Sequence, residues 1–117
     1  MDPATVERAV REGRSLAGED LSGLDLSGLD LSGADLRGAN LRGAVLIRAR
    51  LVGADLRDAD LREADLRYAD LRDADLRGAK LHRANLSGSI RIGAKVRKWA
   101  LKKAWIASPD PVSVHEL

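Results

Sequence analysis

The most regular feature of the chain is a leucine at every fifth position through most of its length: Leu21, Leu26, Leu31, Leu36, Leu41, Leu46, Leu51, Leu56, Leu61, Leu66, Leu71, Leu76, Leu81 and Leu86. Alanine usually stands two residues before the leucine, Asp or Asn stands just before it, and Ser or Arg just after. A period of five would spread the leucines around a helix, and it would send them to alternate faces of a flat strand. The pattern therefore predicts a solenoid, in which the chain turns a corner in every unit and directs each leucine toward one axis.

The repeated unit has the consensus Ala-Asp-Leu-Arg-Gly, as at Ala34–Gly38 and Ala74–Gly78. In this pattern residues 19–88 resemble the pentapeptide-repeat family. The resemblance implies an all-β fold, a right-handed quadrilateral β-helix with four pentapeptides per coil. It also implies that residues twenty apart stack, so that the repeats form about three and a half coils rising roughly 17 Å at the usual strand spacing.

The segment before the repeats is predicted to begin with a helix. Asp2 is a suitable N-cap, and Pro3 suits the first helical position because its missing N–H is not needed there. Leu16 is in phase with the leucine ladder but lacks the preceding Ala and Asp. We therefore expect residues 1–18 to form a capping helix followed by an imperfect first unit, which covers the open end of the solenoid.

The segment after the repeats is predicted to leave the solenoid. The pattern fails at Ser89–Gly93, where Arg91 takes the central position, and a lone arginine is not expected on the leucine axis. An amphipathic helix is expected next, and the Ser-Pro-Asp-Pro sequence that follows would end it. The resulting boundaries are 1–18 for the N-terminal capping helix and first unit, 19–92 for the β-solenoid, 93–108 for a C-terminal capping or dimerisation helix, and 109–117 for a loose tail.

Charged side chains are predicted to form paired rows on the outside of the column. The residues on either side of each leucine face outward, which places Asp35 beside Arg37 and stacks Asp35 with Asp55 one coil further on. Each exposed pair contributes about 0–1 kcal/mol, so the main effect of the pairing is to cancel repulsion within each row.

Glycine at the last position of a unit permits a corner with positive φ. Four successive units have other residues there, namely Asp58, Glu63, Tyr68 and Asp73. These corners are expected to use a turn that does not require glycine.

One stretch has apolar residues at outward positions. Val45, Ile47 and Val52 stand where other units have Asp, Ser or Arg, and Tyr68 is expected one coil above Arg48 at the same corner. The patch has two structural interpretations: the chain's own tail covers it, or Val and Ile are simply tolerated on a β surface. The functional interpretation is a binding site for a partner.

The predicted C-terminal helix supplies the remaining candidate residues. Its apolar side includes Trp99, Leu101, Trp105 and Ile106, and its basic side includes Lys95, Lys98 and Lys102. Such a helix could cap the leucine stack, form a homodimer with a second copy, or lie on an anionic membrane surface. Direct nucleic-acid binding is not expected, because the aromatic residues do not form a base-stacking platform on this helix.

Composition argues against several classes of function. The formal net charge is +2, and residues 89–117 contain six basic and two acidic residues, whereas residues 19–88 are slightly acidic. The chain has no cysteine, and neither His82 nor His115 has neighbours with metal-ligand spacing. We therefore expect no metal, no cofactor, no small-molecule substrate and no enzymatic activity. No apolar segment follows a basic start, which favours a cytoplasmic protein.

The leading functional hypothesis is a non-catalytic scaffold or protein-interaction module with an unidentified partner. The resemblance implies an alternative, because some pentapeptide-repeat proteins are similar in shape and charge to duplex DNA and bind type II topoisomerases such as gyrase. That activity relies on a strongly negative rod, whereas these repeats are nearly neutral. Membrane association through the basic C-terminal helix is the second alternative.

Overall fold

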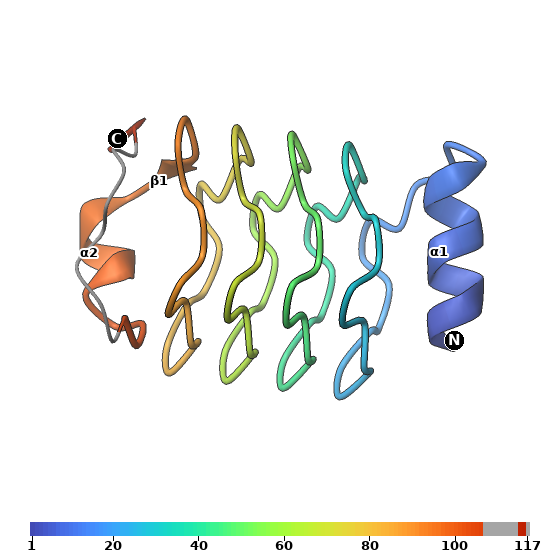
Figure 1. Ribbon diagram of the computed structural model, residues 1–117, viewed down its shortest axis with the longest axis horizontal. Coiled ribbons are helices and arrows are strands. Elements are labelled where there is room, and N and C mark those ends of the chain that lie inside the picture. The colour runs from blue at the N-terminus through green and yellow to red at the C-terminus, as the bar shows by residue number, and fades with distance from the viewer. Residues whose placement is uncertain (107–114, 117) are drawn as a thin grey trace.

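A twenty-residue register holds the chain together. The structure is a computed structural model that describes residues 1–106 and 115–116. Isolated parallel bridges run from Asp20↔Asn40 to Asn85↔Trp105, and each joins residues twenty apart, so four five-residue units make one coil. The coils stand side by side as a column, with α1 (Pro3–Arg11) at one end and α2 (Lys98–Leu101) at the other (Figure 1).

The interior of the column is an aliphatic ladder. The central leucines from Leu16 to Leu86 are buried, and so is every corner alanine from Ala34 to Ala84, which confirms the predicted inward direction of both positions. Leu24 and Leu29 take the place of alanine in the early units and are only partly buried against this core. Small side chains therefore fill the inner corners through most of the column, and larger ones are found near α1.

The hydrogen bonds of one unit explain why Asp or Asn precedes most of the central leucines. In Ala54–Asp58, four of the five backbone N–H groups donate to backbone carbonyls over 2.8–3.1 Å. The fifth, from Arg57, donates to Oδ1 of Asp55 at 3.2 Å. Because an unpaired backbone donor is costly, the side chain before the leucine completes the hydrogen bonding of its own unit.

The prediction that corners without glycine use another turn is wrong. Asp58, Glu63, Tyr68 and Asp73 have φ between 59° and 62°, and Arg48 and Arg83 share this conformation. The backbone at Asp58 is set by the register, since its N–H donates to the carbonyl of Arg77 at 3.0 Å, as that of Gly38 does to Arg57 at 2.9 Å. The coil therefore imposes a left-handed corner whether or not the residue is glycine.

Helix α1 begins as the sequence predicts. Oδ1 of Asp2 accepts a hydrogen bond from the N–H of Thr5 at 2.8 Å, and Pro3 is the first helical residue. Val6 and Ala9 are buried in the same apolar cluster as the leucines. The N–H of Leu16 donates to the carbonyl of Asp35 at 2.9 Å, which joins the unit after α1 to the next coil.

The prediction of one helix over residues 93–108 is wrong for residues 93–106, where the twenty-residue register resumes on both sides of a short helix, and residues 107 and 108 lie outside those the structure describes. β1 (Lys95–Val96) pairs in parallel with β2 (His115–Glu116), and α2 covers only Lys98–Leu101. Val96 is buried at a central position, and Ile106 packs against the core in the same five-residue phase. Trp99 stands where a small corner alanine is needed, and there the chain makes one helical turn instead.

Two further boundaries need correction. Arg91 does not end the solenoid, because it is buried at the central position of its unit. The carbonyls of Ile90 and Ile92 accept hydrogen bonds from backbone N–H groups of the preceding coil, at 2.7 and 2.9 Å. The backbone on both sides is thus held whatever the central side chain is. The tail predicted over 109–117 contains β2, and its other residues lie outside those the structure describes.

Candidate interaction surface

Paired Asp and Arg side chains cover much of the outer wall, as the sequence predicts. Arg62 donates through Nε and Nη2 to the two carboxylate oxygens of Asp60, at 2.8 and 2.6 Å. Mainly this side-chain hydrogen bond lowers the pKa of Asp60 to about 2. The pairs within a unit are Asp35–Arg37, Asp55–Arg57, Asp60–Arg62, Asp65–Arg67, Asp70–Arg72 and Asp75–Arg77.

The Asp60–Arg62 pair predicts a loss of stability in acid. A lowered carboxyl pKa in the folded state stabilises the fold above the unfolded-state pKa of about 3.9, and this contribution is lost as the pH falls toward 2. Asp60→Asn should remove about 1–2 kcal/mol of unfolding free energy at pH 7 and little at pH 2. Urea unfolding at both pH values measures this difference.

Asn40 indicates that the Asp60→Asn variant will keep its turn, because Oδ1 of Asn40 accepts the N–H of Arg42 at 3.0 Å. An equal acid dependence of stability in the variant and the original protein would contradict a contribution from the ion pair.

Charge is divided along the axis of the column. Residues 15–36 contain five acidic and no basic residues, whereas residues 76–106 contain nine basic and no acidic residues. Asp20 and Asp25 in the first coil bond to serines of their own units rather than to arginines: Oγ of Ser22 donates to Oδ1 of Asp20 at 2.6 Å, and the N–H of Ser27 donates to Oδ1 of Asp25 at 3.1 Å. One end of the wall is therefore acidic, the middle is ion-paired, and the far end is basic.

Apolar side chains follow one edge of the column. The predicted patch is present, with Val45, Ile47 and Val52 each partly buried. Arg48 lies over the Tyr68 ring, with its Cζ 5.0 Å from the ring centroid, which places Tyr68 at the expected corner. The apolar edge consists of Val45, Ile47, Val52, Tyr68, Ile90 and Ile92.

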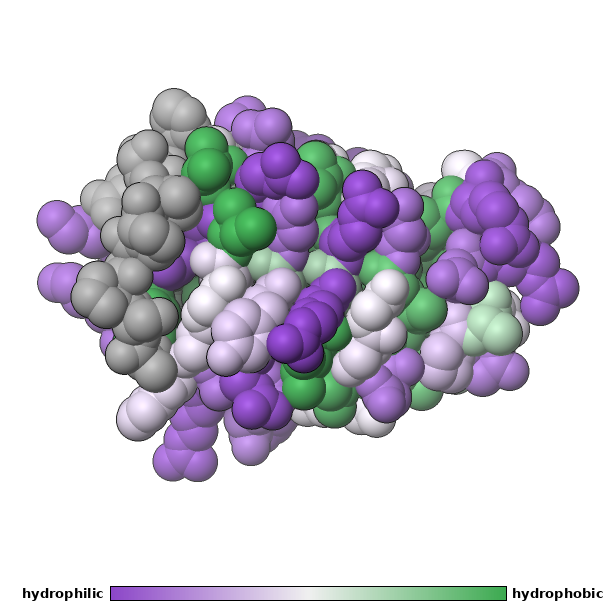
Figure 2. Space-filling model, viewed as in Figure 1, coloured by the Kyte–Doolittle hydropathy of each residue, from purple (hydrophilic) through white to green (hydrophobic). Residues whose placement is uncertain are grey.

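Sequence reasoning missed the two isoleucines of the apolar edge. The bridges Arg50↔Asp70↔Ile90 place Ile90 and Ile92 on the same side of the column as Val52, and both are exposed. They belong to the unit in which the consensus fails. They stand just before and just after the central Arg91, at positions that face outward in the other units, and this placement could have identified them as surface residues. In Figure 2 apolar groups lie between charged ones over the coils of the face in view.

The candidate residues of the predicted C-terminal helix do not share one helical face. Trp99 on α2 and Trp105 on the last coil are exposed, whereas Leu101 and Ile106 pack against the core. Among the basic residues, Lys95 lies in β1, Lys98 begins α2 and Lys102 follows it, and all three are exposed. The segment therefore presents two separate tryptophans and dispersed lysines.

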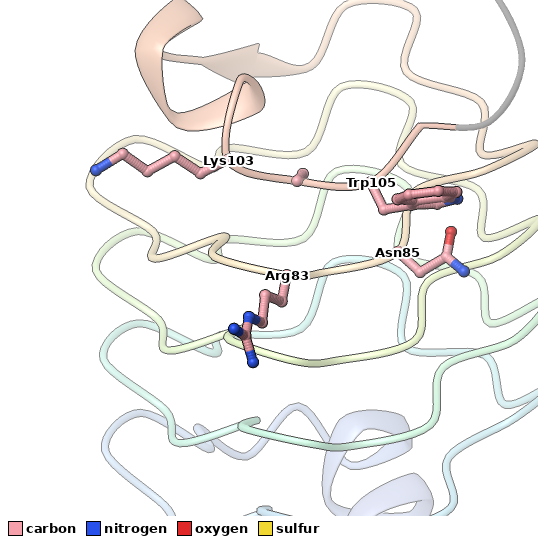
Figure 3. Close-up of a pocket in the computed structure, with 5 residues that line it drawn as sticks. Arg83, Asn85, Lys103 and Trp105 are labelled. Carbon is pink, nitrogen blue, oxygen red and sulfur yellow. The ribbon is translucent and has the colours of Figure 1, made fainter.

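Two adjoining cavities lie along a second edge of the column and share Arg83. One has a volume of about 380 Å³ and is lined by Arg83, Asn85, Lys103, Ala104 and Trp105. The other has a volume of about 310 Å³ and is lined by Arg42, Arg62, Glu63, His82 and Arg83. Figure 3 shows Lys103 and Arg83 on one side of the first cavity and Trp105 above Asn85 on the other.

Within residues 1–106 and 115–116, no group of three or more His, Cys, Asp or Glu residues is placed to hold a metal ion. No helix in these described ranges is long and apolar enough to cross a membrane.

The repeats match a known family. The profile of pentapeptide repeats matches residues 20–58 and 54–90, with eight copies. This chain belongs to the pentapeptide-repeat family. The family has a right-handed β-helix fold, in agreement with the twenty-residue register of this pentapeptide-repeat protein. No curated protein matches the chain.

Solved structures of pentapeptide-repeat proteins resemble this one. Rfr23 from the cyanobacterium Cyanothece 51142 is 33% identical with a TM-score of 0.64, over 81% of this chain and 59% of Rfr23. A protein of the Arabidopsis thaliana thylakoid lumen is 37% identical with a TM-score of 0.52, over 79% of this chain and 70% of that protein. QnrB1, a plasmid-mediated fluoroquinolone resistance protein, is 23% identical with a TM-score of 0.53, over 70% of this chain and 55% of QnrB1. This chain therefore spans about three fifths of Rfr23, and QnrB1 shares the fold.

Proposed function

We propose that this pentapeptide-repeat protein is a non-catalytic interaction module that binds a protein partner along its apolar edge. The observation that carries the proposal is the occurrence of exposed or half-buried apolar side chains on one edge, in the coils on both sides of the Asp65–Arg67 and Asp70–Arg72 pairs and at the Tyr68 corner between these pairs. Tyr68 is 55% exposed at the middle of this edge. Exposed apolar side chains grouped on a rigid frame are typical of protein-binding surfaces.

The frame supports this function because it fixes where each outward side chain lies. The corner of Tyr68 is held by its N–H, which donates to the carbonyl of Ser87 at 3.0 Å, and its ring contacts Arg48. A side chain held in this way loses little conformational freedom when a partner binds. At the ends of the frame, we propose that α1 caps the leucine ladder through Val6 and Ala9 and that the α2 segment caps the other end.

Site-specific photocrosslinking tests the proposed edge. Benzoylphenylalanine replacing Tyr68 should crosslink a defined protein in cells that express the chain. The same photoreactive residue replacing Arg57, on the ion-paired wall, should give no such product. Crosslinked proteins are identified by mass spectrometry. Capture of the same set of proteins from both positions, or of none from position 68, would overturn the proposal.

Binding to a type II topoisomerase by DNA mimicry is less well supported. Six wall aspartates each pair with an arginine of their own unit, and the last coils are basic rather than acidic. We therefore expect gyrase supercoiling to be unchanged by micromolar amounts of the protein. Inhibition at that concentration would favour the mimic over the apolar edge as the main function.

A second copy of the chain is a further candidate partner. Trp99 and Trp105 are 54% and 63% exposed near one end of the column, and exposed tryptophans are enriched at interface centres. Sedimentation equilibrium of the original protein and of the Trp99→Ala, Trp105→Ala variant compares dimer with monomer. The membrane alternative relies on an amphipathic helix over residues 93–108, and in the described part of that segment α2 covers only four residues, which gives this alternative less support.

A further inference from the structure

We propose that the basic edge, which consists of Arg42, Arg62, Lys80, Arg83, Lys102 and Lys103, binds single-stranded nucleic acid. In this arrangement the phosphates contact the cations, and a base stacks on the indole of Trp105. The proposal concerns a different edge from the apolar edge and does not depend on the function assigned there.

The charge of this edge increases toward the last coils. In the coils nearer α1, Arg62 is paired with Asp60, and Arg42 is paired with Glu63 at 3.0 Å. In the coils nearer α2, no acidic residue occurs anywhere between residues 76 and 106. Lys80 lies next to Asp60 of the preceding coil and helps to lower its pKa, whereas Arg83 and Lys102 form no ion pair within the described ranges and are exposed. A polyanion can thus approach Arg83 and Lys102 without displacing a carboxylate.

Two neighbouring cavities form a shallow groove along this edge, with Arg83 lining both of them. They adjoin at Arg83, and together they extend from Arg42 to Trp105 along the direction in which the coils stack. Because stacked strands lie about 4.8 Å apart, the groove offers a positive side chain at short, regular steps. An extended phosphate chain can follow such a row of positive side chains.

Trp105 supplies the stacking surface that a basic groove alone would lack. The bridge Asn85↔Trp105 places the two residues one coil apart on the same side, and Trp105 is 63% exposed. Figure 3 shows the indole lying above the Asn85 amide at the rim of the cavity. The helix predicted from sequence would have placed Trp105 elsewhere, which is why nucleic-acid binding was not expected.

The chemistry favours a single strand over other anionic partners. A flat exposed indole beside cations and an amide matches an unpaired base and its phosphates, because every base offers a π-face and polar edge atoms. An acidic peptide would bind the cations without stacking on the indole of Trp105. In a duplex the bases are stacked on one another and are not available to Trp105. A membrane would instead require apolar side chains that project from the basic surface.

Fluorescence anisotropy with a 5′-labelled ten-nucleotide oligothymidylate tests the proposal. Binding should fall in the range of roughly 10⁻⁶–10⁻⁴ M near physiological salt and should strengthen as salt is lowered. Trp105→Ala should weaken binding roughly 5- to 150-fold and leave the salt dependence unchanged, because it removes stacking but no charge. Trp99→Ala is the matched control, since Trp99 is similarly exposed but lines neither cavity. The Nζ atom of Lys103 lies 5.8 Å from the centroid of the Trp99 ring, but the substitution removes no charge, so binding should change less than about two-fold.

The charge contribution is tested with Arg83→Gly combined with Lys103→Gln. Arg83 has φ +60°, which glycine adopts readily, and Lys103 is exposed, so this variant should fold. Its plot of log K against log salt should be shallower by about 1.4, because each phosphate that is no longer neutralised reduces the slope by about 0.7. Circular dichroism verifies that each variant keeps the fold.

Three outcomes would overturn the proposal. The first is no binding of the oligonucleotide at low salt. The second is equal weakening by Trp105→Ala and Trp99→Ala. The third is binding of poly-glutamate, or of vesicles containing one quarter phosphatidylserine, that matches the oligonucleotide in affinity and is equally sensitive to Trp105→Ala.

Discussion

Replacing Leu61 with alanine is expected to lower the unfolding free energy by about 2–5 kcal/mol. Leu61 is fully buried in the middle of the column, and its ladder neighbours Leu41 and Leu81 are buried as well. The coils on both sides are fixed by backbone bonds in register, so they cannot close the cavity that the substitution leaves. Guanidinium unfolding followed by circular dichroism measures the change.

Ile92→Ala is the matched control for the loss of an aliphatic side chain. Ile92 is 48% exposed at an outward position, so its replacement should cost about 0.5 kcal/mol or less. Similar losses for the two variants would contradict the assignment of the leucine ladder as the main source of stability.

Replacing Gly88 with alanine is expected to destabilise the protein by more than replacing Gly28. Both glycines belong to the same row of corners and have φ of +72° and +71°. A left-handed alanine costs about 1–2 kcal/mol at either site. At Gly88 a Cβ atom would also lie 2.5 Å from the Tyr68 ring, whereas at Gly28 nothing lies within 4 Å.

The additional cost at Gly88 should disappear when the ring is removed. In a Tyr68→Gly background, Gly88→Ala should cost no more than Gly28→Ala does in the original protein, as measured by a thermodynamic cycle. Persistence of the additional cost without the ring would show that the backbone, and not the side chain one coil below, limits position 88.

The sequence predicts the interior of this fold better than its ends. Leu61 and Ala64 show why. A period of five with a large and a small apolar residue is satisfied when the leucine points to the axis and the alanine fills the inner corner, and both side chains are buried. The conformation of Tyr68 was not predictable from local turn preferences, because the register with the next coil imposes a positive φ on a residue that avoids it. Non-local backbone bonds here override local preference.

The end of the solenoid was misjudged for a similar reason. Val96 and Ile106 keep the five-residue phase, but Arg91 and Trp99 interrupt the consensus between the leucines and suggested that the repeat had ended. The wall pairs such as Asp60–Arg62 followed directly from the pattern. The neighbourhood of Trp105 did not, because it depends on which side of which coil the residue occupies.

The lengthwise division of charge has a consequence for how this molecule meets others. Five acids gather in residues 15–36 and nine bases in residues 76–106, which gives the column a permanent electric dipole along its long axis. In the field of a charged target the molecule is turned before contact, so an anionic surface meets the late coils first. Because this torque acts through solvent, it weakens as ionic strength shortens the screening length, which is about 8 Å under physiological conditions.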